Sequence, residues 1–325
     1  MLRPFTIRDL SLWRSASGQA VFLHPQSLFT QGAGAVMRGA FLSPLSGLSG
    51  IFTYVHHAQG NNLAIIGQVA HFLGSPVAYC RFISPQSALS SRGLPDLLDG
   101  MLKLVGSRGA HSLIAEVDED SNAFGALRQN GFSIYARQQI WKMEKTPNVV
   151  GRNSLWRHAL TSDELAVQIL RNGLVPGQFQ QFDETKENLD GYVLYQHEKL
   201  LAYAEVKRGP RGIWVQPFVS LDADPFDIAL TDLITRLRPR VGRPVFICLR
   251  SYQDWLQRPL KKLGVDPGPY QAVMAKRTTL PLKVEETRRI PVVNRSAEPT
   301  TPIHAPLPRA REPEWIRYDQ TPNYR

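Results

Sequence analysis

Cysteine is scarce in this sequence: Cys80 and Cys248 are the only two in 325 residues. Two cysteines about one domain apart are too few for a disulfide framework or a cysteine-based metal cluster. Both lie in apolar, strand-like runs, so we expect buried thiols that pack as small hydrophobic residues. The His-Glu-x-x-His motif is also missing, and His56 and His57 point to opposite faces of a strand. We therefore predict no metal site.

Long hydrophobic runs are missing too. The longest candidate, residues 34–55, is rich in Gly and Ser and is broken by Arg38 and Pro44, so it does not offer the ~20 apolar residues of a membrane span. The first eight residues alternate like a strand and lack the apolar centre of a signal peptide. These features predict a soluble protein without a membrane partner, and the cytoplasm is the default compartment.

Charge of one sign is not concentrated anywhere. The net charge of +10 divides into +4 over residues 1–147, +4 over residues 148–280 and +2 over residues 281–325. A nucleic-acid-binding protein usually gathers its basic residues on one face or segment. One local cluster, Arg236 to Arg243, follows a predicted helix, whose C-terminal end cations stabilise. A nucleic-acid partner is therefore not expected.

Proline content separates the C-terminal tail from the rest. Residues 281–325 contain 8 of the 24 prolines and lose apolar periodicity, so this segment buries too little apolar area to offset the entropy of ordering. We predict a disordered tail over 281–325. The preceding 280 residues are long enough for two domains, which we place at 1–147 and 148–280.

The two predicted domains repeat one order of elements: hairpin, strand, loop, helix, strand, helix, glycine, strand. The glycine that ends the second helix is Gly131 in the first copy and Gly264 in the second, 133 residues later. In the first copy we expect strands over 4–9, 64–72, 76–83, 111–117 and 132–143, and helices from Pro95 and over 122–129. In the second copy we expect strands over 191–195, 200–206, 212–221, 244–249 and 270–276, and helices over 162–170, from Asp224-Pro225 and over 254–263.

The first copy resembles the GNAT superfamily of acyl-CoA-dependent N-acyltransferases. The resemblance rests on the order of elements and on Leu113-Ile114-Ala115-Glu116-Val117 followed by Asn122, Ala126-Leu127 and Gly131-Phe132. It covers roughly residues 1–145, and a weaker copy covers 150–279. It implies an α/β (α+β) chain of two GNAT-like domains, each a mixed, mostly antiparallel central sheet flanked by helices, with a degenerate second copy.

The resemblance also implies a site for acetyl-CoA in the first domain. The family binds the coenzyme along a splayed strand and holds its pyrophosphate on backbone amides at the start of the next helix, where N–H groups are unpaired. The matching positions here are Phe82, Ile83, Ser91, Arg92, Gly93 and Leu94. Pro95 departs from the family pattern, because it replaces a small residue and removes an amide. The second-domain loop has Asp222 and Asp224 and no glycine, so we expect no coenzyme there.

N-acylation needs a base that deprotonates the acceptor amine, and an acid that protonates the departing thiolate. Many family members place a Tyr for the second role where this chain has Leu127 and Leu260. Tyr79 or Tyr135 substitutes for it, a water molecule does, or the domain is not catalytic. Glu116 is the candidate base, with a solvated or salt-bridged carboxylate as the alternative.

The leading hypothesis is an N-acyltransferase that transfers an acyl group, such as acetyl, from acyl-CoA to a primary amine in the first domain. The alternative is a non-catalytic tandem GNAT-like protein that binds a ligand or a partner. The absence of the catalytic Tyr and the presence of Pro95 favour this non-catalytic alternative.

Overall fold

The computed structural model describes residues 2–41, 49–57, 64–147, 154–182, 189–223 and 225–278. The tail predicted to be disordered, 281–325, and Asp224, where a helix was predicted to begin, lie outside these residues. No helix in the described part of the chain combines the length and the apolar character that crossing a membrane requires.

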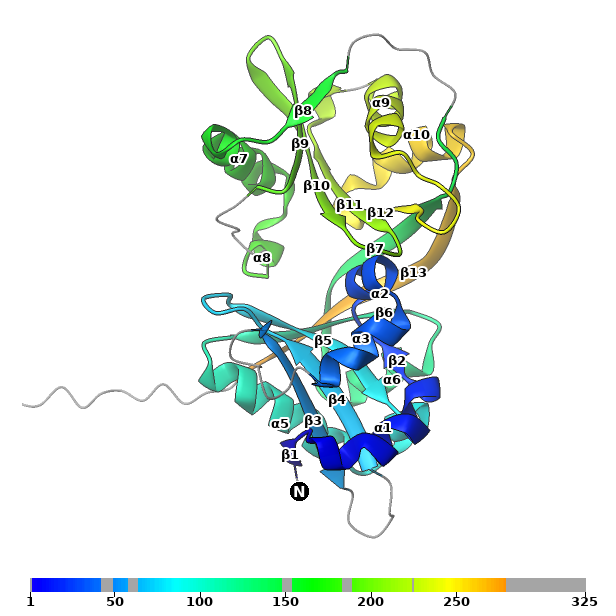
Figure 1. Cartoon of the computed structure of the whole chain (residues 1–325). Helices are drawn as coiled ribbons and strands as arrows, with labels where there is room; N and C mark the ends of the chain where they lie inside the picture. Colours follow the sequence, from blue (N-terminus) through cyan, green and yellow to red (C-terminus); the bar gives the residue numbers. More distant parts are fainter. Residues whose placement is uncertain are drawn as a thin grey trace, which may run out of the picture. The chain divides into compact units, whose positions relative to one another are not determined.

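The first half alternates strands with helices in the predicted order (Figure 1). Its strands are β1 (Leu2–Pro4), β2 (Val21–Phe22), β3 (Ile51–His57), β4 (Ala64–Ala70), β5 (Val77–Ser84), β6 (Ser112–Asp118) and β7 (Ser133–Met143). Its helices are α1 (Leu10–Ala16), α2 (Pro25–Gln31), α3 (Ala33–Arg38), α5 (Leu94–Ser107) and α6 (Asn122–Gln129), with 3₁₀ turns η1 (Ile7–Asp9), η2 (Ser17–Gln19) and η4 (Gln86–Ser90).

The second half repeats the order. Its strands are β8 (Trp156–His158), β9 (Gly191–Gln196), β10 (Lys199–Arg208), β11 (Ile213–Val219), β12 (Val245–Arg250) and β13 (Asp266–Arg277). Its helices are α7 (Glu164–Leu174), α8 (Gly177–Gln180), α9 (Asp227–Leu237) and α10 (Gln257–Lys262), with 3₁₀ turns η5 (Thr161–Asp163), η6 (Leu221–Ala223) and η7 (Ser251–Leu256).

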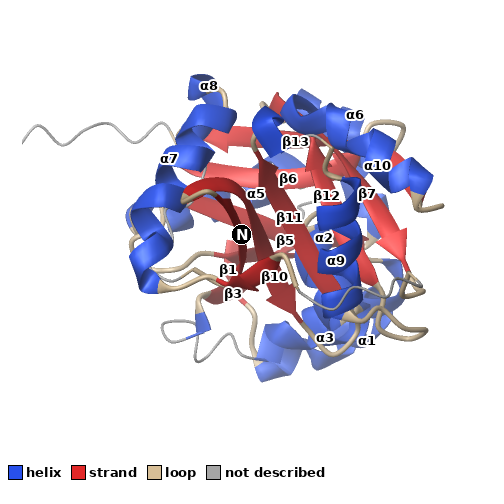
Figure 2. Cartoon of the chain, turned by 90° about the horizontal axis from the view of Figure 1, so that it is seen from above, coloured by secondary structure: helices blue, strands red, loops and turns tan. Residues whose placement is uncertain are grey.

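The strands of both halves join in one mostly antiparallel sheet with helices on its faces (Figure 2). The order along the sheet is β1-β3-β4-β5-β6-β13-β7-β12-β11-β10-β9-β8. The last strand of each half therefore crosses over: β13 pairs with β6 of the first half, and β7 pairs with β12 of the second. Residues 1–280 form one compact unit, and the predicted boundary at 147/148 remains a prediction.

The crossing strands meet at a pair of glutamines. Gln138 of β7 lies opposite Gln271 of β13, and their side chains are joined by a 2.9 Å hydrogen bond. The two residues are 133 positions apart, the same offset that separates Gly131 from Gly264. Because each glutamine is the counterpart of the other, this pair marks the centre of the repeat.

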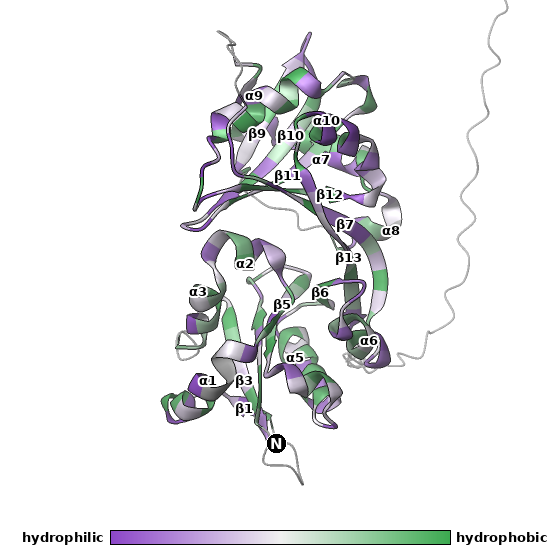
Figure 3. Cartoon of the chain, turned by 90° about the vertical axis from the view of Figure 1, so that its right-hand side faces the viewer, coloured by the Kyte–Doolittle hydropathy of each residue, from purple (hydrophilic) through white to green (hydrophobic). Residues whose placement is uncertain are grey.

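Each half has a core on both faces of its part of the sheet. In the first half α5 and α6 pack on one face, and α1 and α3 pack on the other (Figure 3). The apolar spacing that predicted α5 buries Leu97, Leu98 and Met101, each completely inaccessible to solvent. In the second half α9 and α10 cover one face and α7 covers the other.

One prediction about the N-terminal region is wrong. In place of the strand predicted over 4–9, the chain has a strand that ends at Pro4, followed by the 3₁₀ turn η1. The stretch from there to residue 64 contains the helices α1, α2 and α3 and also the strands β2 and β3, for which no range was predicted. Strand β3 has the buried pattern of a central strand, and His56 and His57 are its last two residues. Burial lowers the pKa of His56, a residue that is 5% exposed.

Both cysteines are buried free thiols, as predicted. Burial raises the pKa of each thiol to about 12. A thiol with such a pKa stays protonated and is a poor nucleophile near neutral pH.

Each half opens with an arginine and an aspartate six positions later, a repeat that the sequence analysis missed. Arg3 forms a bidentate ion pair with Asp9, and Arg157 forms the same pair with Asp163 at 2.7 Å for both bonds. Both carboxylates are almost inaccessible, at 2% and 3% exposure of the residue. The side-chain bonds from the arginines hold the pKa of each aspartate at about 2.

We predict that Asp163→Asn lowers the free energy of unfolding at pH 7 by about 2 kcal/mol, because one pKa unit corresponds to about 1.4 kcal/mol. The pKa of Asp163 is lower in the folded than in the unfolded chain, so this contribution is complete above the unfolded pKa and is lost as pH falls toward 2. Urea unfolding at pH 7 and pH 3 measures it. A difference between wild type and variant that does not shrink at pH 3 would contradict the assignment. Asp232→Asn, at a more exposed carboxylate in the same half, is the control.

Candidate active site

Strands β5 and β6 are parallel at their start and then separate. Their register covers only Val77 to Tyr79 against Ser112 to Ile114, and no pairing continues beyond Tyr79. Separation of two neighbouring parallel strands leaves backbone N–H and C=O groups without ladder partners. This is the position at which the resemblance places the coenzyme.

The chain's own residues 21–23 fill the gap between these strands. Val21 and Phe22, which form β2, pair with Ile83 and Phe82 of β5. One residue further, the N–H of Leu23 donates to the carbonyl of Arg81 at 2.9 Å, and the carbonyl of Leu23 accepts from the N–H of Glu116, also at 2.9 Å. Leu23 is 1% exposed and therefore spans the gap from β5 to β6. We call residues 21–23 the wedge segment.

Phe82 and Ile83, predicted to bind the coenzyme, have no open strand edge in this structure. They pair with β4 on one side and with the wedge segment on the other. Their side chains are fully buried and lie in different cores, Phe82 among the residues packed by α3 and Ile83 among those packed by α5.

The amides that were expected to hold a pyrophosphate are used within the turn before α5. The N–H of Gly93 donates to the hydroxyl of Ser91 at 3.0 Å, and the N–H of Leu94 donates to the carbonyl of Ser91 at 3.1 Å. Leu94 is buried in the core, and Arg92 is exposed with no hydrogen-bond or ion-pair partner among the described residues. As they stand, these residues do not fit a bound coenzyme; Arg92 alone offers its charge to solvent.

Glu116 and Tyr79, the two predicted catalytic residues, line one polar cavity where β5 and β6 begin to separate. We call it the seam cavity. Its volume is about 60 Å³, enough for a few water molecules. The lining comes from both halves: Gln26, Tyr79, Glu116, Tyr135, Arg171, Phe182, Glu205, Trp214, Gln216 and Arg250.

Glu116 is the most buried acid of this cavity, and its carboxylate is held by two polar side chains, Gln138 and Arg250. It is 5% exposed. Its Oε2 accepts from Nε2 of Gln138 at 3.1 Å, and its Oε1 lies 3.4 Å from Nη2 of Arg250. The chain of bonds continues from Gln138 to Gln271 and from Gln271 to Asp118. Glu116 is therefore neither a solvated strand end nor alone: it is a buried, salt-bridged carboxylate that faces a cavity.

Arg250 supplies the positive charge next to Glu116. Burial by itself would lower the pKa of this guanidinium, but Tyr135, Cys248 and Glu116 outweigh it, so the pKa lies above its ordinary value. Nη1 of Arg250 is buried without a hydrogen-bond partner among the described residues. A fixed cation with a free donor stabilises negative charge that develops nearby.

Tyr79 is half-buried, and its ring packs against that of His24, with the two ring centroids 4.8 Å apart. His24 follows the wedge segment directly. The residue next to the wedge segment therefore contacts one predicted catalytic residue.

The positions at which many GNAT proteins place a catalytic Tyr are core positions here. Leu127 and Leu260 are both fully buried among apolar side chains. Tyr135, the other tyrosine considered for this role, lies at a bulge of β7 and lines the seam cavity. An extra residue at a bulge redirects side chains.

The loop before α9 in the second half is acidic, as its sequence indicated. Asp222 is exposed, and its carboxylate binds Nζ of Lys199 at 2.6 Å, which lowers the pKa of Asp222. In the described part of the chain, no group of three or more His, Cys, Asp and Glu side chains is placed to hold a metal ion.

Sequence reasoning missed the residues that the second half contributes to the seam cavity. Arg171 of α7, Glu205 of β10 and Arg250 of β12 are more than 50 positions from Glu116 and reach it only because β7 and β13 cross. Arg81 was missed too. It is 3% exposed and bound by the amides of Gln68 and Gln31, and burial lowers its pKa to about 10.

Comparisons with known proteins support the fold. No family model matches the sequence, and no curated protein matches it. Among solved structures, a proposed acetyltransferase from Pyrococcus horikoshii aligns with a TM-score of 0.51 at 14% identity, over 86% of this chain and 89% of that one. A GCN5-related N-acetyltransferase from Sphaerobacter thermophilus aligns with a TM-score of 0.50 at 13% identity, over 87% of this chain and 97% of that one.

The chain therefore has the fold of GNAT acetyltransferases, and its two halves are tandem copies of that fold. The predicted fold class is confirmed.

Proposed function

We propose that the chain is an N-acyltransferase that transfers an acyl group, acetyl in the simplest case, from acyl-CoA to a primary amine at the seam cavity. The observation that carries this proposal is the convergence of Glu116 and Tyr79, both chosen from sequence, on one buried polar cavity at the point where β5 and β6 separate. The acetyltransferase folds of the similar structures support it.

In this proposal Glu116 takes the proton that the attacking amine loses, directly or through a water molecule in the cavity. The coenzyme supplies the acyl group as a thioester. Transfer joins the amine nitrogen to the acyl carbon as the carbon–sulfur bond breaks, and the hydroxyl of Tyr79 donates a proton to the departing sulfur. The proton on Glu116 then passes through water in the shared cavity to the Tyr79 oxygen, which restores both groups. Arg250 steadies the negative charge on Glu116 before it takes the proton.

The wedge segment sets a condition on this function. A coenzyme that lies along β5 needs the strand edge that Val21 and Phe22 occupy. We propose that the wedge segment leaves this edge when the coenzyme binds. The predicted coenzyme positions Ser91, Arg92, Gly93 and Leu94 remain proposals, with the further condition that the amides of Gly93 and Leu94 exchange their bonds to Ser91 for the coenzyme.

The test is the release of free thiol from acetyl-CoA in the presence of a panel of primary amines. We expect release that needs both the protein and an amine. Absence of release by the wild type and by a variant with a destabilised wedge segment would overturn the proposal.

A non-catalytic GNAT-fold binding protein is the second candidate, and one observation favours it. Leu23 is hydrogen-bonded to both β5 and β6 and is buried, as a permanent part of the sheet would be. On this alternative no variant of the wedge segment gains affinity for acetyl-CoA.

A further inference from the structure

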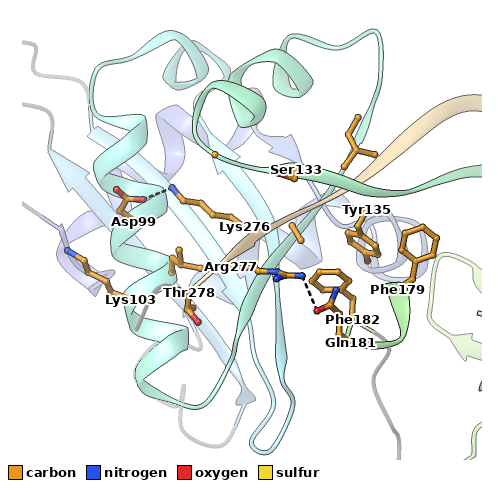
Figure 4. Close-up of a pocket in the computed structure, with 14 residues that line it drawn as sticks. Asp99, Lys103, Ser133, Tyr135, Phe179, Gln181, Phe182, Lys276, Arg277 and Thr278 are labelled. Carbon is orange, nitrogen blue, oxygen red and sulfur yellow. Dashed lines mark hydrogen bonds and ion pairs between the residues drawn. The ribbon is translucent and has the colours of Figure 1, made fainter. Parts of the chain in front are cut away.

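A second, more open pocket lies near the other end of β6 and β13. Its volume is about 790 Å³, within the range of small-molecule sites. Parts of α5, α8, β7 and β13 line it (Figure 4). We call it the aromatic pocket.

The wall that faces the seam is built from three aromatic rings. Tyr135 and Phe182 are stacked with centroids 4.3 Å apart, and Phe179 lies 6.0 Å from Tyr135. Flat rings at such spacing offer a face on which a planar ligand group can stack. The neighbouring Ile134, Leu102 and Ala275 extend the apolar surface.

The lining of the pocket also carries excess positive charge. It contains Lys103, Lys276 and Arg277, against one acid, Asp99. Asp99 pairs with Lys276 at 2.5 Å, so the charges of Lys103 and Arg277 are left uncompensated within the pocket lining. Arg277 is exposed and holds its guanidinium 3.0 Å from Oε1 of Gln181, beside the ring of Phe182 (Figure 4). A ligand that fits both the rings and the charges has a planar part and an anionic part.

Two residues belong to both cavities. Tyr135 and Phe182 line the aromatic pocket on one side and the seam cavity on the other. The stacked pair therefore separates the open pocket from the cavity that contains Glu116. A ligand with its ring on this pair places a substituent next to the seam.

From these contacts we propose that the aromatic pocket binds the acceptor, and that the acceptor is a small aromatic amine bearing a carboxylate. Its carboxylate lies toward Arg277 and Lys103, its ring lies on Tyr135, Phe179 and Phe182, and its amine points past the stacked pair toward Glu116. This inference rests on the proposed function for the role of the ligand, but binding itself does not require turnover.

The experiment is a calorimetric titration of 4-aminobenzoate, without coenzyme, against the wild type and against Arg277→Ala and Lys103→Ala. The uncharged analogue 4-aminobenzamide is titrated in parallel. Arg258→Ala, which removes an exposed arginine of α10 away from the pocket, is the matched control.

We expect 4-aminobenzoate to bind the wild type about tenfold more tightly than 4-aminobenzamide, and each pocket variant to lose about fivefold, since a partly exposed ion pair contributes up to ~1 kcal/mol. Added salt lowers the affinity for 4-aminobenzoate and leaves the affinity for 4-aminobenzamide unchanged. Arg258→Ala binds as the wild type does.

Equal affinity for the carboxylate and the amide, no binding of 4-aminobenzoate at millimolar concentration, or binding that Arg277→Ala leaves intact would overturn this inference. Its failure is distinct from failure of the proposed function. If 4-aminobenzoate binds but no thiol is released from acetyl-CoA, the aromatic pocket is supported and the acyltransferase function is rejected. If thiol is released with other amines but 4-aminobenzoate does not bind, the acyltransferase function is supported and the role of the pocket is rejected.

Discussion

Leu23→Pro is expected to raise the affinity for acetyl-CoA by about a hundredfold or more. Proline removes the N–H that donates to Arg81 and also removes a buried side chain. A lost hydrogen bond costs ~1 kcal/mol, and a large-to-small change at a buried leucine costs ~2–5 kcal/mol. Both losses destabilise only the closed form, in which Leu23 lies buried between β5 and β6. Where the closed form dominates, apparent affinity rises by the same factor as the open population, about tenfold per 1.4 kcal/mol.

Two variants separate the backbone from the side chain. Leu23→Ala keeps the N–H and loses most of the side chain, so its gain in affinity is smaller than that of Leu23→Pro, by about fivefold for a bond of ~1 kcal/mol. Leu260→Ala removes a fully buried leucine of the second half. It lowers the melting temperature without changing acetyl-CoA binding.

Isothermal titration calorimetry measures these affinities, and circular dichroism confirms that each variant is folded. If Leu23→Pro lowers the melting temperature as Leu260→Ala does and binds acetyl-CoA no better than the wild type, residues 21–23 are a fixed strand. The non-catalytic candidate would then be the better description.

The regular elements of the two halves were predictable because their apolar periodicity is strong. Helix α6 begins and ends at the predicted residues, and α5 differs from its prediction by one residue at its start. Local signals sufficed there: Pro95 stands in the first turn, and Ser121 caps α6 with a bond to the N–H of Phe124. Such signals depend on neighbours in sequence, which the sequence displays.

The wedge segment could not be predicted, because a strand of two residues has no period. Val21 and Phe22 are read as a strand only beside Ile83 and Phe82, about 60 positions away. The crossing of β7 and β13 has the same character. Their patterns indicate strands but not partners, and pairing with the other half decides which residues meet Glu116.

The candidate site was predictable to the extent that chemistry is local. A carboxylate within the otherwise apolar run Leu113 to Val117 is costly to bury alone, so its presence signalled a partner or a role. The identity of that partner, Arg250, is not local, because it lies 134 positions away on β12. The Arg–Asp repeat at the start of each half was available in the sequence and identifies the tandem copies independently of their apolar pattern.

Glu116→Gln is expected to lower the rate of acetyl transfer by about a hundredfold or more and to leave acetyl-CoA affinity unchanged. Loss of a positioned general base typically costs 10²–10⁴-fold in rate. The amide also leaves the charge of Arg250 uncompensated, so the melting temperature falls as well. The two effects are separated by a thiol-release assay run below the melting temperature, in the wild-type and Leu23→Pro backgrounds.

The control for this prediction is Glu119→Gln, at the residue that directly follows β6. Glu119 pairs with Arg137 at 2.7 Å and does not line the seam cavity. A pair this exposed contributes little, so the rate should stay within about twofold of the wild type. Glu116→Asp keeps the carboxylate but withdraws it from Gln138, so it should recover part of the rate. Equal rates for the wild type and Glu116→Gln would show that Glu116 is not the base, because a glutamine amide cannot accept a proton from the amine. Glu116 would then be only a structural partner of Arg250.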